Sequence, residues 1–466
     1  MEVKKYLDQT WSVLEKAEKN FHNQPILKSN DPIKVKNGIK TSFPEKEQTF
    51  ETVLEDFESE ILPWLNRNTD TRFGAYITGS GNKVAALAEF IKAYFNQNGL
   101  KWNNSPIASE LEQIVLKWVA EYVGLPDFSK GVLTSGGSMS NLMSIHFALA
   151  DRFPNREMNG FYGEKPFTIY CSNQTHSSID RAMVFLGLGR DYLRKINVNE
   201  QFEIDLNQLR TSIEEDLEND LNPLMIIGNA GTTNTGSIDD LNALADLAEE
   251  FGLWFHVDGA YGLPARRLPN LKEAFNGVER ADSVIINPHK WMYVTFEASC
   301  VLLKSIPEAI HFSPDYLFTE NPGVRWESSS HTIELSKEFR ALKIWFTMKY
   351  YGASQLEQFV KQDIDQISLL GTLLAQEDNI QVEPHHPLSI LCFRWFDQGK
   401  TKEENEQINI QAIRMIETEG EIFITGTKLR GETYLRVYFG NPDRKDSDVE
   451  FMKNQIMDTF QRILTH

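Results

Sequence analysis

The middle of the chain alternates short apolar runs with stretches of helical periodicity. The apolar runs are GVLTSGG, FTIYCSNQTH, PLMIIGNAGTT, LWFHVDGAYG, SVIINPHKW and SCVLLK, separated by stretches such as IDDLNALADLAEEFG. Strands and helices that alternate in this way predict an α/β fold, with a mostly parallel sheet covered by helices on both faces. Ligands of such sheets bind outside the carboxyl ends of the strands. Most of the runs end in a polar or glycine-rich cluster, so we expect these clusters to line one crevice.

The two flanks of this region have other patterns. Residues 1–75 are predicted to form a helical, amphipathic arm, in which the segment Thr49 to Leu65 reads as one helix with an apolar face. Such an arm cannot bury its apolar stripe alone, and we expect it to pack on another domain or another subunit. Residues 76–345 are predicted to form the large domain. Residues 346–466 are predicted to form a small α+β domain, with a hairpin in EIFITGTKLRGETYLRVYFG.

Composition and charge exclude several classes of protein. The 466 residues include 47 Lys and Arg against 66 Asp and Glu, a net charge of −19, which disfavours binding to nucleic acid or anionic membranes. Cys171, Cys300 and Cys392 are odd in number and far apart, which excludes a disulfide framework or a zinc knuckle. The start, MEVKKYLDQTWSVLEKAEKN, has no secretory pattern, and no run approaches the ~18 apolar residues of a membrane span. We expect a cytoplasmic protein without a metal, and we interpret His385-His386 as a structural pair.

Two strand ends carry residues of chemical interest. Lys290 directly follows the β-rich run SVIINPH. Partial burial there lowers the pKa of a lysine and makes it a nucleophile, although such a lysine can also simply extend its ammonium into solvent. Asp258 follows the run LWFHV, and Gly259-Ala260 leaves room for a flat ligand. This aspartate, taken alone, could bind a metal, cap a helix or pair with a cation.

Three further clusters follow other strands. In GVLTSGGSMSN, the segment Ser135-Gly136-Gly137-Ser138 leads into a helix whose N-terminus favours an anion such as a phosphate. His176 follows FTIYCSNQT, where a histidine can stack on a ring, shuttle a proton or fill the core. Small polar groups end the run PLMIIGNAGTT, at Asn229, Thr232 and Thr233.

These residues together predict one cofactor. A cofactor that carries an aldehyde, an aromatic ring nitrogen and a phosphate needs a lysine, a carboxylate, a ring stacker and a phosphate cradle. In that arrangement Lys290 forms the Schiff base, Asp258 keeps the pyridine nitrogen protonated, and the glycine-rich turn holds the phosphate. The combination therefore predicts pyridoxal 5'-phosphate.

The motifs also resemble a known family. TSGGSMSN, NQTHSSIDRA, HVDGAYG and NPHKW, in that order, are similar to the motifs of the group II pyridoxal-phosphate amino-acid decarboxylases. That family includes the aromatic-L-amino-acid, glutamate and cysteine-sulfinate decarboxylases, and the resemblance spans from about Phe50 to the C-terminus. It implies the pyridoxal-phosphate-dependent transferase fold of type I, which is aspartate aminotransferase-like, with a mostly parallel seven-stranded sheet in the large domain.

The resemblance assigns a role to each matched residue. Lys290, Asp258 and His176 are the implied catalytic residues, with His176 stacked on one face of the cofactor ring and Ala260 packed on the other. The remaining implied cofactor contacts are Gly136, Gly137, Ser138, Asn229, Asn287 and His289. The implied reaction converts an L-amino acid to its amine through an external aldimine and a quinonoid carbanion. The family is an intertwined homodimer with shared active sites, in which the N-terminal arm clasps the partner.

The substrate remains open in the sequence. Positions that match substrate contacts of the family are Tyr76, Thr78, Gly79, Leu100 and Arg436. The stretch Asn96-Gln97-Asn98 is polar where aromatic decarboxylases are apolar, and TSGGSMSN and PDYLF are closer to the glutamate and cysteine-sulfinate branch. The polar stretch could equally face a subunit interface, and Arg436 could equally form a structural salt bridge.

One departure from the family concerns its mobile lid. The long connection from about Phe312 to Ser330 is predicted to be this lid, and the family's proton-donating tyrosine falls near Ser328. Tyr316, His331, His176 or water could replace it. In some relatives the loss of this tyrosine accompanies conversion to an aldehyde synthase. An aldehyde synthase or a carbon–carbon lyase of the same fold is therefore the alternative function, and a catalytically silent binding or regulatory subunit is the alternative from another class.

Overall fold

The structure is a computed structural model that describes residues 2–20, 24–40, 42–307, 325–384 and 387–465. The chain divides into two compact units. The first unit comprises Met1–Tyr76, Asp365–Pro384 and Leu391–His466, and the second comprises Ile77–Ile364 and His385–Ile390. The predicted N-terminal arm thus belongs to the same unit as most of the C-terminal residues. The His385-His386 pair and most of the predicted lid lie outside the described residues.

The second unit is built on a seven-stranded sheet of order β1-β7-β6-β5-β4-β2-β3. Its strands are β1 (Lys130–Thr134), β2 (Phe167–Ser172), β3 (Leu193–Ile196), β4 (Asn222–Asn229), β5 (Trp254–Asp258), β6 (Ser283–Ile286) and β7 (Ser299–Leu303). Only β7 runs antiparallel to its neighbours, β1 and β6. The other neighbouring strands are parallel. The mostly parallel seven-stranded sheet predicted for this fold type is confirmed.

The sequence of each strand reflects its place in the sheet. Every residue of β2, β6 and β7 is buried, as expected for strands that are covered on both faces. Strand β3 lies at the edge, and only its two end residues, Leu193 and Ile196, are buried. This strand was not predicted, because the run LRKI shows no continuous apolar segment.

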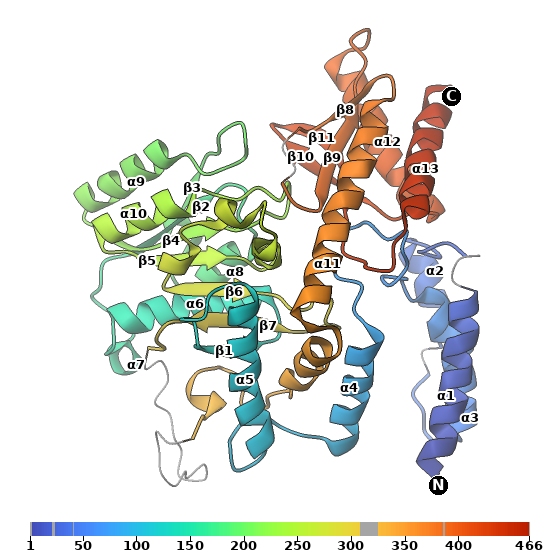
Figure 1. Cartoon of the computed structure of the whole chain (residues 1–466), viewed down its shortest axis with the longest axis horizontal. Coiled ribbons are helices and arrows are strands. Elements are labelled where there is room, and N and C mark those ends of the chain that lie inside the picture. Colours follow the sequence, from blue (N-terminus) through green and yellow to red (C-terminus); the bar gives the residue numbers. More distant parts are fainter. Residues whose placement is uncertain (1, 21–23, 41, 308–324, 385–386, 466) are drawn as a thin grey trace. The chain divides into compact units, whose positions relative to one another are not determined.

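Helices cover both faces of this sheet. Figure 1 shows α9 and α10 against one face and α6 against the other. The helices of this unit are α4 (Lys83–Phe95), α5 (Pro106–Tyr122), α6 (Gly137–Arg152), α7 (Arg156–Asn159), α8 (Ser178–Phe185), α9 (Leu206–Glu218) and α10 (Leu241–Phe251), together with the first part of α11 (Ala341–Ala375). Short 3₁₀ turns join them at η4 (Arg190–Tyr192), η5 (Leu263–Arg267), η6 (Lys272–Phe275), η7 (Val278–Arg280) and η9 (Ser328–Ser330).

The first unit contains a four-stranded sheet of order β10-β11-β9-β8. Its strands are β8 (Ile380–Val382), β9 (Ile390–Trp395), β10 (Thr425–Leu429) and β11 (Glu432–Tyr438), and its C-terminal helices are α12 (Lys402–Glu419) and α13 (Asp446–Thr465). The predicted hairpin is confirmed as β10 and β11, which pair antiparallel around Arg430-Gly431. Both turn residues have positive φ, as a two-residue hairpin turn requires. Apolar residues of the sheet and of both helices form one core.

The N-terminal residues of the first unit form three helices, α1 (Glu2–Lys19), α2 (Pro32–Asn37) and α3 (Phe50–Asp56). The single helix predicted for residues 49–65 is wrong in extent. It divides into α3, the π-helical turn η2 (Phe57–Ile61) and the 3₁₀ turn η3 (Leu62–Trp64), which contains Pro63. A proline has no N–H group and cannot continue an α-helix. Helix α1 buries none of its residues, and Trp11 remains 60% exposed.

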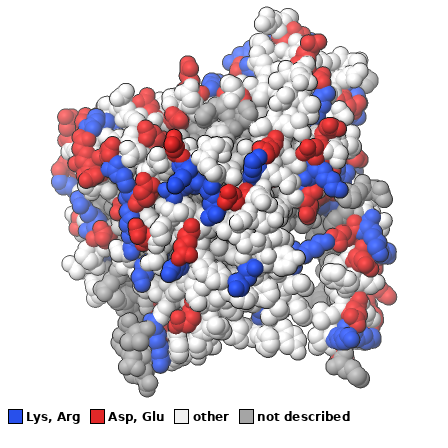
Figure 2. Space-filling model, viewed as in Figure 1, with Lys and Arg blue, Asp and Glu red and all other residues white. Residues whose placement is uncertain are grey.

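The surface charge, the helices and the cysteines can be compared with what the composition suggests. On the face seen in Figure 2, acidic and basic side chains are interspersed and form no broad basic patch. Within the part of the chain that the structure describes, no helix combines the length and apolar character needed to cross a bilayer. The same residues contain no cluster of three or more potential metal ligands. All three cysteines are buried, and none of them forms a disulfide.

Candidate active site

A cavity of about 400 Å³ lies in the second unit, where the carboxyl ends of β1, β2, β4, β5 and β6 meet. All ten residues that the sequence assigned to a cofactor line it, namely Gly136, Gly137, Ser138, His176, Asn229, Asp258, Ala260, Asn287, His289 and Lys290. Its volume lies within the range typical of small-molecule sites, roughly 300–1,000 Å³. The predicted crevice is thus formed by strand ends that are far apart in the sequence.

Lys290 enters the cavity from the turn that follows β6. Its backbone N–H donates to the carbonyl oxygen of Asn287 over 2.9 Å, which closes the turn. Burial lowers the pKa of the lysine, and the charge of Asp258 acts in the opposite direction. A Cβ atom at Gly79 would collide with the carbonyl oxygen of Lys290, so this glycine lets a second segment pass behind the lysine. A lysine with a lowered pKa is suited to attack an aldehyde.

Asp258 ends β5 and has a fixed orientation. Its Oδ1 accepts the backbone N–H of Ala260 over 3.2 Å, and its Oδ2 accepts Nδ2 of Asn141 over 3.0 Å. Asn141 also lines the cavity, although the sequence did not identify it. The available signal was its position in TSGGSMSN, one helical turn after Gly137, because residues four apart share a face of a helix.

The glycine-rich turn forms a cradle for an anion. Gly136 to Ser138 stand at the start of the 16-residue helix α6, whose first N–H groups have no partner within the helix. A Cβ atom at Gly137 would lie 2.9 Å from Nδ2 of Asn287, so glycine is needed at this close approach. Asn287 is itself held by Ser299, whose hydroxyl donates to Oδ1 over 2.6 Å.

His289 adds a further donor beside the turn. Its Nδ1 accepts the backbone N–H of Ala298 over 3.0 Å, so the hydrogen of the neutral ring lies on Nε2. Burial, followed by the charge of Lys290, lowers the pKa of His289 to about 3 and keeps the ring neutral at neutral pH. The ring stacks on Phe296, with 4.6 Å between centroids. An N–H donor, an amide and a helix N-terminus together fit a phosphate.

Asn229 is held rigidly at the end of β4. Its Nδ2 donates to Asp239 over 2.8 Å, to Thr175 over 3.0 Å and to Ser172 over 3.2 Å. Asp239 also accepts the backbone N–H of Asn229 over 2.7 Å. Burial raises the pKa of Asp239 to about 6. These contacts use the amide hydrogens of Asn229 and leave its oxygen as the group available to a ligand.

Comparison with known proteins identifies the family. The model of the pyridoxal-dependent decarboxylase conserved domain matches residues 32–396. The chain belongs to the pyridoxal-dependent decarboxylase family. It is therefore a carboxy-lyase whose cofactor is pyridoxal phosphate. The residues around the cavity fit this cofactor, because they supply a lysine, a carboxylate, a flat imidazole and an anion cradle in one place.

Relatives of this decarboxylase cover most of its length. The aromatic-L-amino-acid decarboxylase of Bacillus atrophaeus is 29% identical over 91% of this chain and 88% of its own length. The phenylacetaldehyde synthase of Petunia hybrida is 30% identical over 91% of this chain and 87% of its own. The structure of the Catharanthus roseus tryptophan decarboxylase in complex with L-tryptophan superposes with a TM-score of 0.90 at 25% identity, covering 99% and 98% of the two chains.

The predicted substrate residues of the decarboxylase are divided between the two units, and those of the second unit lie outside the lining of the cavity. Thr78, Gly79 and Leu100 belong to the second unit but do not line it, and Gly79 serves the backbone packing described above. Tyr76 and Arg436 belong to the first unit, so their substrate role stays a prediction. Residues that line the cavity beyond the assigned set include Asn141, Ser178, Phe296 and Glu297. Sequence spacing alone did not indicate Phe296 and Glu297.

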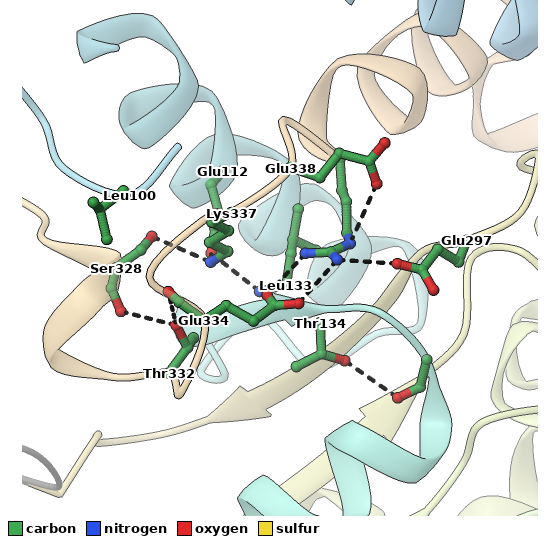
Figure 3. A network of polar contacts seen from close by, with 12 residues as sticks. Leu100, Glu112, Leu133, Thr134, Glu297, Ser328, Thr332, Glu334, Lys337 and Glu338 are labelled. Carbon is green, nitrogen blue, oxygen red and sulfur yellow. Dashed lines mark hydrogen bonds and ion pairs between the residues drawn. The ribbon is translucent and has the colours of Figure 1, made fainter. Parts of the chain in front are cut away.

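Ser328, at the predicted place of the lid tyrosine, belongs to a buried polar network instead (Figure 3). The ammonium of Lys337 donates to the Ser328 hydroxyl over 3.2 Å and to Glu112 over 2.6 Å. Glu112 also accepts the backbone N–H of Leu133, in β1, over 3.0 Å. The backbone N–H of Ser329 donates to the carbonyl oxygen of Leu100 over 3.3 Å. Ser328 does not line the cavity, and Tyr316 lies outside the described residues.

Proposed function

We propose that this decarboxylase converts an L-amino acid to the corresponding amine at the cavity beside Lys290. The observation that carries the proposal is the convergence of Lys290, Asp258 and the Gly136–Ser138 turn on one cavity. Bound pyridoxal phosphate supplies an electron sink next to the α-carbon of the substrate. Lys290 would hold the cofactor through its aldehyde carbon. Asp258 pairs with the ring nitrogen and favours its protonated form.

The other cavity residues hold the cofactor in place. The first turn of α6, His289 and Asn287 hold the phosphate through N–H donors, while Asn229 contacts the ring. Ala260 and His176, which both line the cavity, would hold the two faces of the ring. The Nδ1 atom of His176 accepts the backbone N–H of Ser178 over 3.2 Å, so its neutral ring carries the hydrogen on Nε2. That N–H can hold the substrate carboxylate until it leaves.

Aromatic L-amino acids are the substrate class that the relatives favour. The Bacillus and Catharanthus proteins are named for aromatic amino acids and share 29% and 25% of aligned residues with this chain. Phe296 supports the same class, because its ring lines the cavity and is 56% exposed. Acidic amino acids are the competing class in the test, because Asn96-Gln97-Asn98 is polar.

We also propose that the chain acts as a homodimer in a reducing compartment such as the cytoplasm. Trp11 and Leu14 of α1 are 60% and 44% exposed, and a second copy could cover them. Cys171, Cys300 and Cys392 form no disulfide, which supports the compartment. Sedimentation of the purified protein at several concentrations tests the dimer, and a monomer at micromolar concentration would exclude it.

Aldehyde synthesis is the second candidate function. A serine at position 328, tied to Lys337, offers no phenol to protonate the α-carbon. One relative, 30% identical, is named as a phenylacetaldehyde synthase. In this candidate, the amino acid, molecular oxygen and water give the aldehyde, carbon dioxide, ammonia and hydrogen peroxide, so that oxygen is the two-electron oxidant.

Product analysis separates the candidates. Purified protein with pyridoxal phosphate is incubated in air with aromatic and acidic L-amino acids, and products and dissolved oxygen are measured. An amine without oxygen uptake supports decarboxylation, and an aldehyde with oxygen uptake supports the synthase. A Lys290→Ala variant is the control for both. Cofactor binding without turnover on the whole panel would favour the silent-subunit alternative.

A further inference from the structure

A chain of buried hydrogen bonds leads from the interior of the second unit to Asp258. Asn141, in α6, donates to Oδ2 of Asp258 over 3.0 Å. Its Oδ1 lies 3.0 Å from Nε2 of His256, which is fully buried in β5. Nδ1 of His256 contacts the hydroxyl of Ser283 over 2.8 Å, and that hydroxyl accepts the indole N–H of Trp254 over 2.8 Å. The sequence does not reveal this chain, because its residues come from three elements, and α6 is distant in the sequence from β5 and β6.

The direction of every hydrogen in the chain is determined by its two ends. The indole N–H of Trp254 can only donate, so the Ser283 oxygen accepts it and still has its own hydrogen to donate to Nδ1 of His256. The carboxylate of Asp258 accepts at the other end, so the Asn141 amide presents its NH₂ there and its oxygen to His256. Nε2 of His256 therefore carries the hydrogen. A flipped Asn141 amide would set two acceptor oxygens against each other.

The same amide holds a second cavity residue. The other hydrogen on Nδ2 of Asn141 is directed at the hydroxyl of Ser178 over 2.9 Å. That hydroxyl contacts Nδ1 of His176 over 2.9 Å, so it donates there and supports the hydrogen on Nε2 of His176. One amide thus holds Asp258 directly and His176 through Ser178. Buried groups satisfied in this way are fixed in position, because losing one partner leaves the others uncompensated.

Neutral His256 is a condition for this arrangement. Burial lowers the pKa of His256 to about 4, while Asp258 acts in the opposite direction. The groups that face the ring are Ser283 from β6, Asn141 from α6 and the charge of Asp258 from β5. A neutral ring with its hydrogen on Nε2 is the form that locks the Asn141 amide.

We propose that Asn141 and His256 are positioning residues that fix Asp258 and His176 together against the pyridoxal phosphate ring. The inference rests on the proposed function, since it assigns Asp258 to the ring nitrogen and His176 to the ring face. Asn141 sets which oxygen of Asp258 faces the cofactor, and His256 keeps the Asn141 amide from flipping. Neither residue takes part in bond making.

Paired substitutions test the two residues. Asn141→Leu keeps the shape of the side chain and removes both donors. His256→Phe removes the Nε2 hydrogen, whereas His256→Gln can place an amide donor near the same point. Asn409→Leu is the matched control, because Asn409 is equally buried and hydrogen-bonded, at Trp395 and Asn405 of the first unit. Each protein is titrated with pyridoxal phosphate while its visible absorbance spectrum is recorded, and its thermal unfolding is measured without cofactor.

The expected result separates positioning from stability. Asn141→Leu and His256→Phe bind pyridoxal phosphate about tenfold more weakly and give an altered absorbance band, since a charged-group hydrogen bond is lost or loosened. His256→Gln restores the spectrum and most of the affinity. Asn409→Leu unfolds at a lower temperature yet binds cofactor with the original affinity and spectrum.

Other outcomes overturn the proposal in distinguishable ways. Original affinity and spectrum in both Asn141→Leu and His256→Phe would show that the chain only stabilises the fold. The same spectral change in Asn409→Leu would show that the change reflects general loss of stability. If the unaltered protein takes up no pyridoxal phosphate, the proposed function itself fails, and this inference fails with it.

Discussion

Two buried polar networks of the second unit use a lysine in opposite ways. In the first, Lys290 stands beside Asp258 at the cavity, has a lowered pKa and makes no ion pair with another described residue. In the second, the side chain of Lys337 is completely buried and bonded to Glu112 over 2.6 Å. Lys337 also donates to Ser328, and Glu112 also accepts the backbone N–H of Leu133. The first network leaves the amino group of Lys290 available to a ligand. In the second, the charges of Lys337 and Glu112 are paired with each other.

The difference shows what makes a buried lysine reactive. Burial alone disfavours the charged form of a lysine, but a close carboxylate with several hydrogen bonds restores it. Lys337 has such a carboxylate and links β1 to the segment that contains Ser328. Lys290 has only the more distant charge of Asp258, which the Asn141 amide and the Ala260 N–H already engage. The chemistry is therefore expected at Lys290, and stability is expected at Lys337.

Replacing Lys290 should have the largest effect on activity. We expect Lys290→Ala to lower the rate of product formation roughly 10⁴-fold, because the covalent link to the cofactor and its proton acceptor are lost. Unfolding in urea without cofactor should remain unchanged or shift to higher stability, since a desolvated ammonium is removed. Activity near the original value would contradict the assignment of Lys290.

Replacing Lys337 should have the largest effect on stability. Lys337→Met leaves Glu112 buried and unpaired, so we expect a loss of about 3–5 kcal/mol in the free energy of unfolding. Urea unfolding of the protein without cofactor measures it. The double variant Lys337→Met/Glu112→Leu should regain most of the loss, because neither charge remains. A double variant as unstable as the single one would show that the carboxylate is not the cause.

Replacing Asp239 tests whether its hydrogen bonds to Asn229 and Ile204 hold the cavity lining in place. In Asp239→Asn, one acceptor oxygen becomes a donor that faces the N–H groups of Asn229 or Ile204. We expect a loss of about 2 kcal/mol in stability and weaker binding of pyridoxal phosphate, measured by unfolding and by titration. Asp240→Asn is the matched control. Asp240 caps α10 at the surface, where asparagine caps equally well, so its stability should stay within about 0.5 kcal/mol.

The pH dependence of stability tests the neutral state of His256. Its pKa falls from 6.5 to about 4 on folding, so between these pH values the unfolded chain binds more protons. Stability contributed by this residue is complete above pH 6.5 and is lost as the pH falls. Asp239, with a pKa raised from 3.8 to about 6, acts with the opposite sign.

Comparison of the unaltered protein with His256→Gln isolates the contribution of His256 to the pH dependence of stability. Between pH 4 and 6.5, the slope of unfolding free energy against pH should be less steep in this variant by about 1.4 kcal/mol per pH unit. Unfolding midpoints in urea across this range provide the measurement. Parallel curves for the two proteins would mean that His256 titrates alike in the folded and unfolded chain.

Replacing Ser328 should have the smallest effect on the free energy of unfolding. Ser328→Ala removes one acceptor from Lys337 but leaves Glu112 in place, so we expect a loss of about 1 kcal/mol. The rate and the identity of the product should not change, because Ser328 lies outside the cavity lining. A changed ratio of amine to aldehyde would place this residue in the chemistry.

The sequence by itself determined most of the sheet and the residues that line the cavity. Apolar runs of β-prone residues predicted six of the seven strands, and β3 was missed because its polar edge residues hide it. Because the carboxyl ends of parallel strands meet at one edge, residues placed directly after those runs had to converge. Lys290, Asp258, Asn229 and His176 follow this rule, and all line the cavity.

Only the tertiary structure decided what surrounds these residues. Asn141 reaches Asp258 because α6 packs across the sheet, and His256 is close to Asn141 for the same reason. Lys337 meets Glu112 across 225 residues of sequence. No local pattern encodes such contacts, since each depends on how a helix packs on strands that are distant in the sequence. Strand ends are fixed by local periodicity, whereas the partners that hold them are fixed by packing.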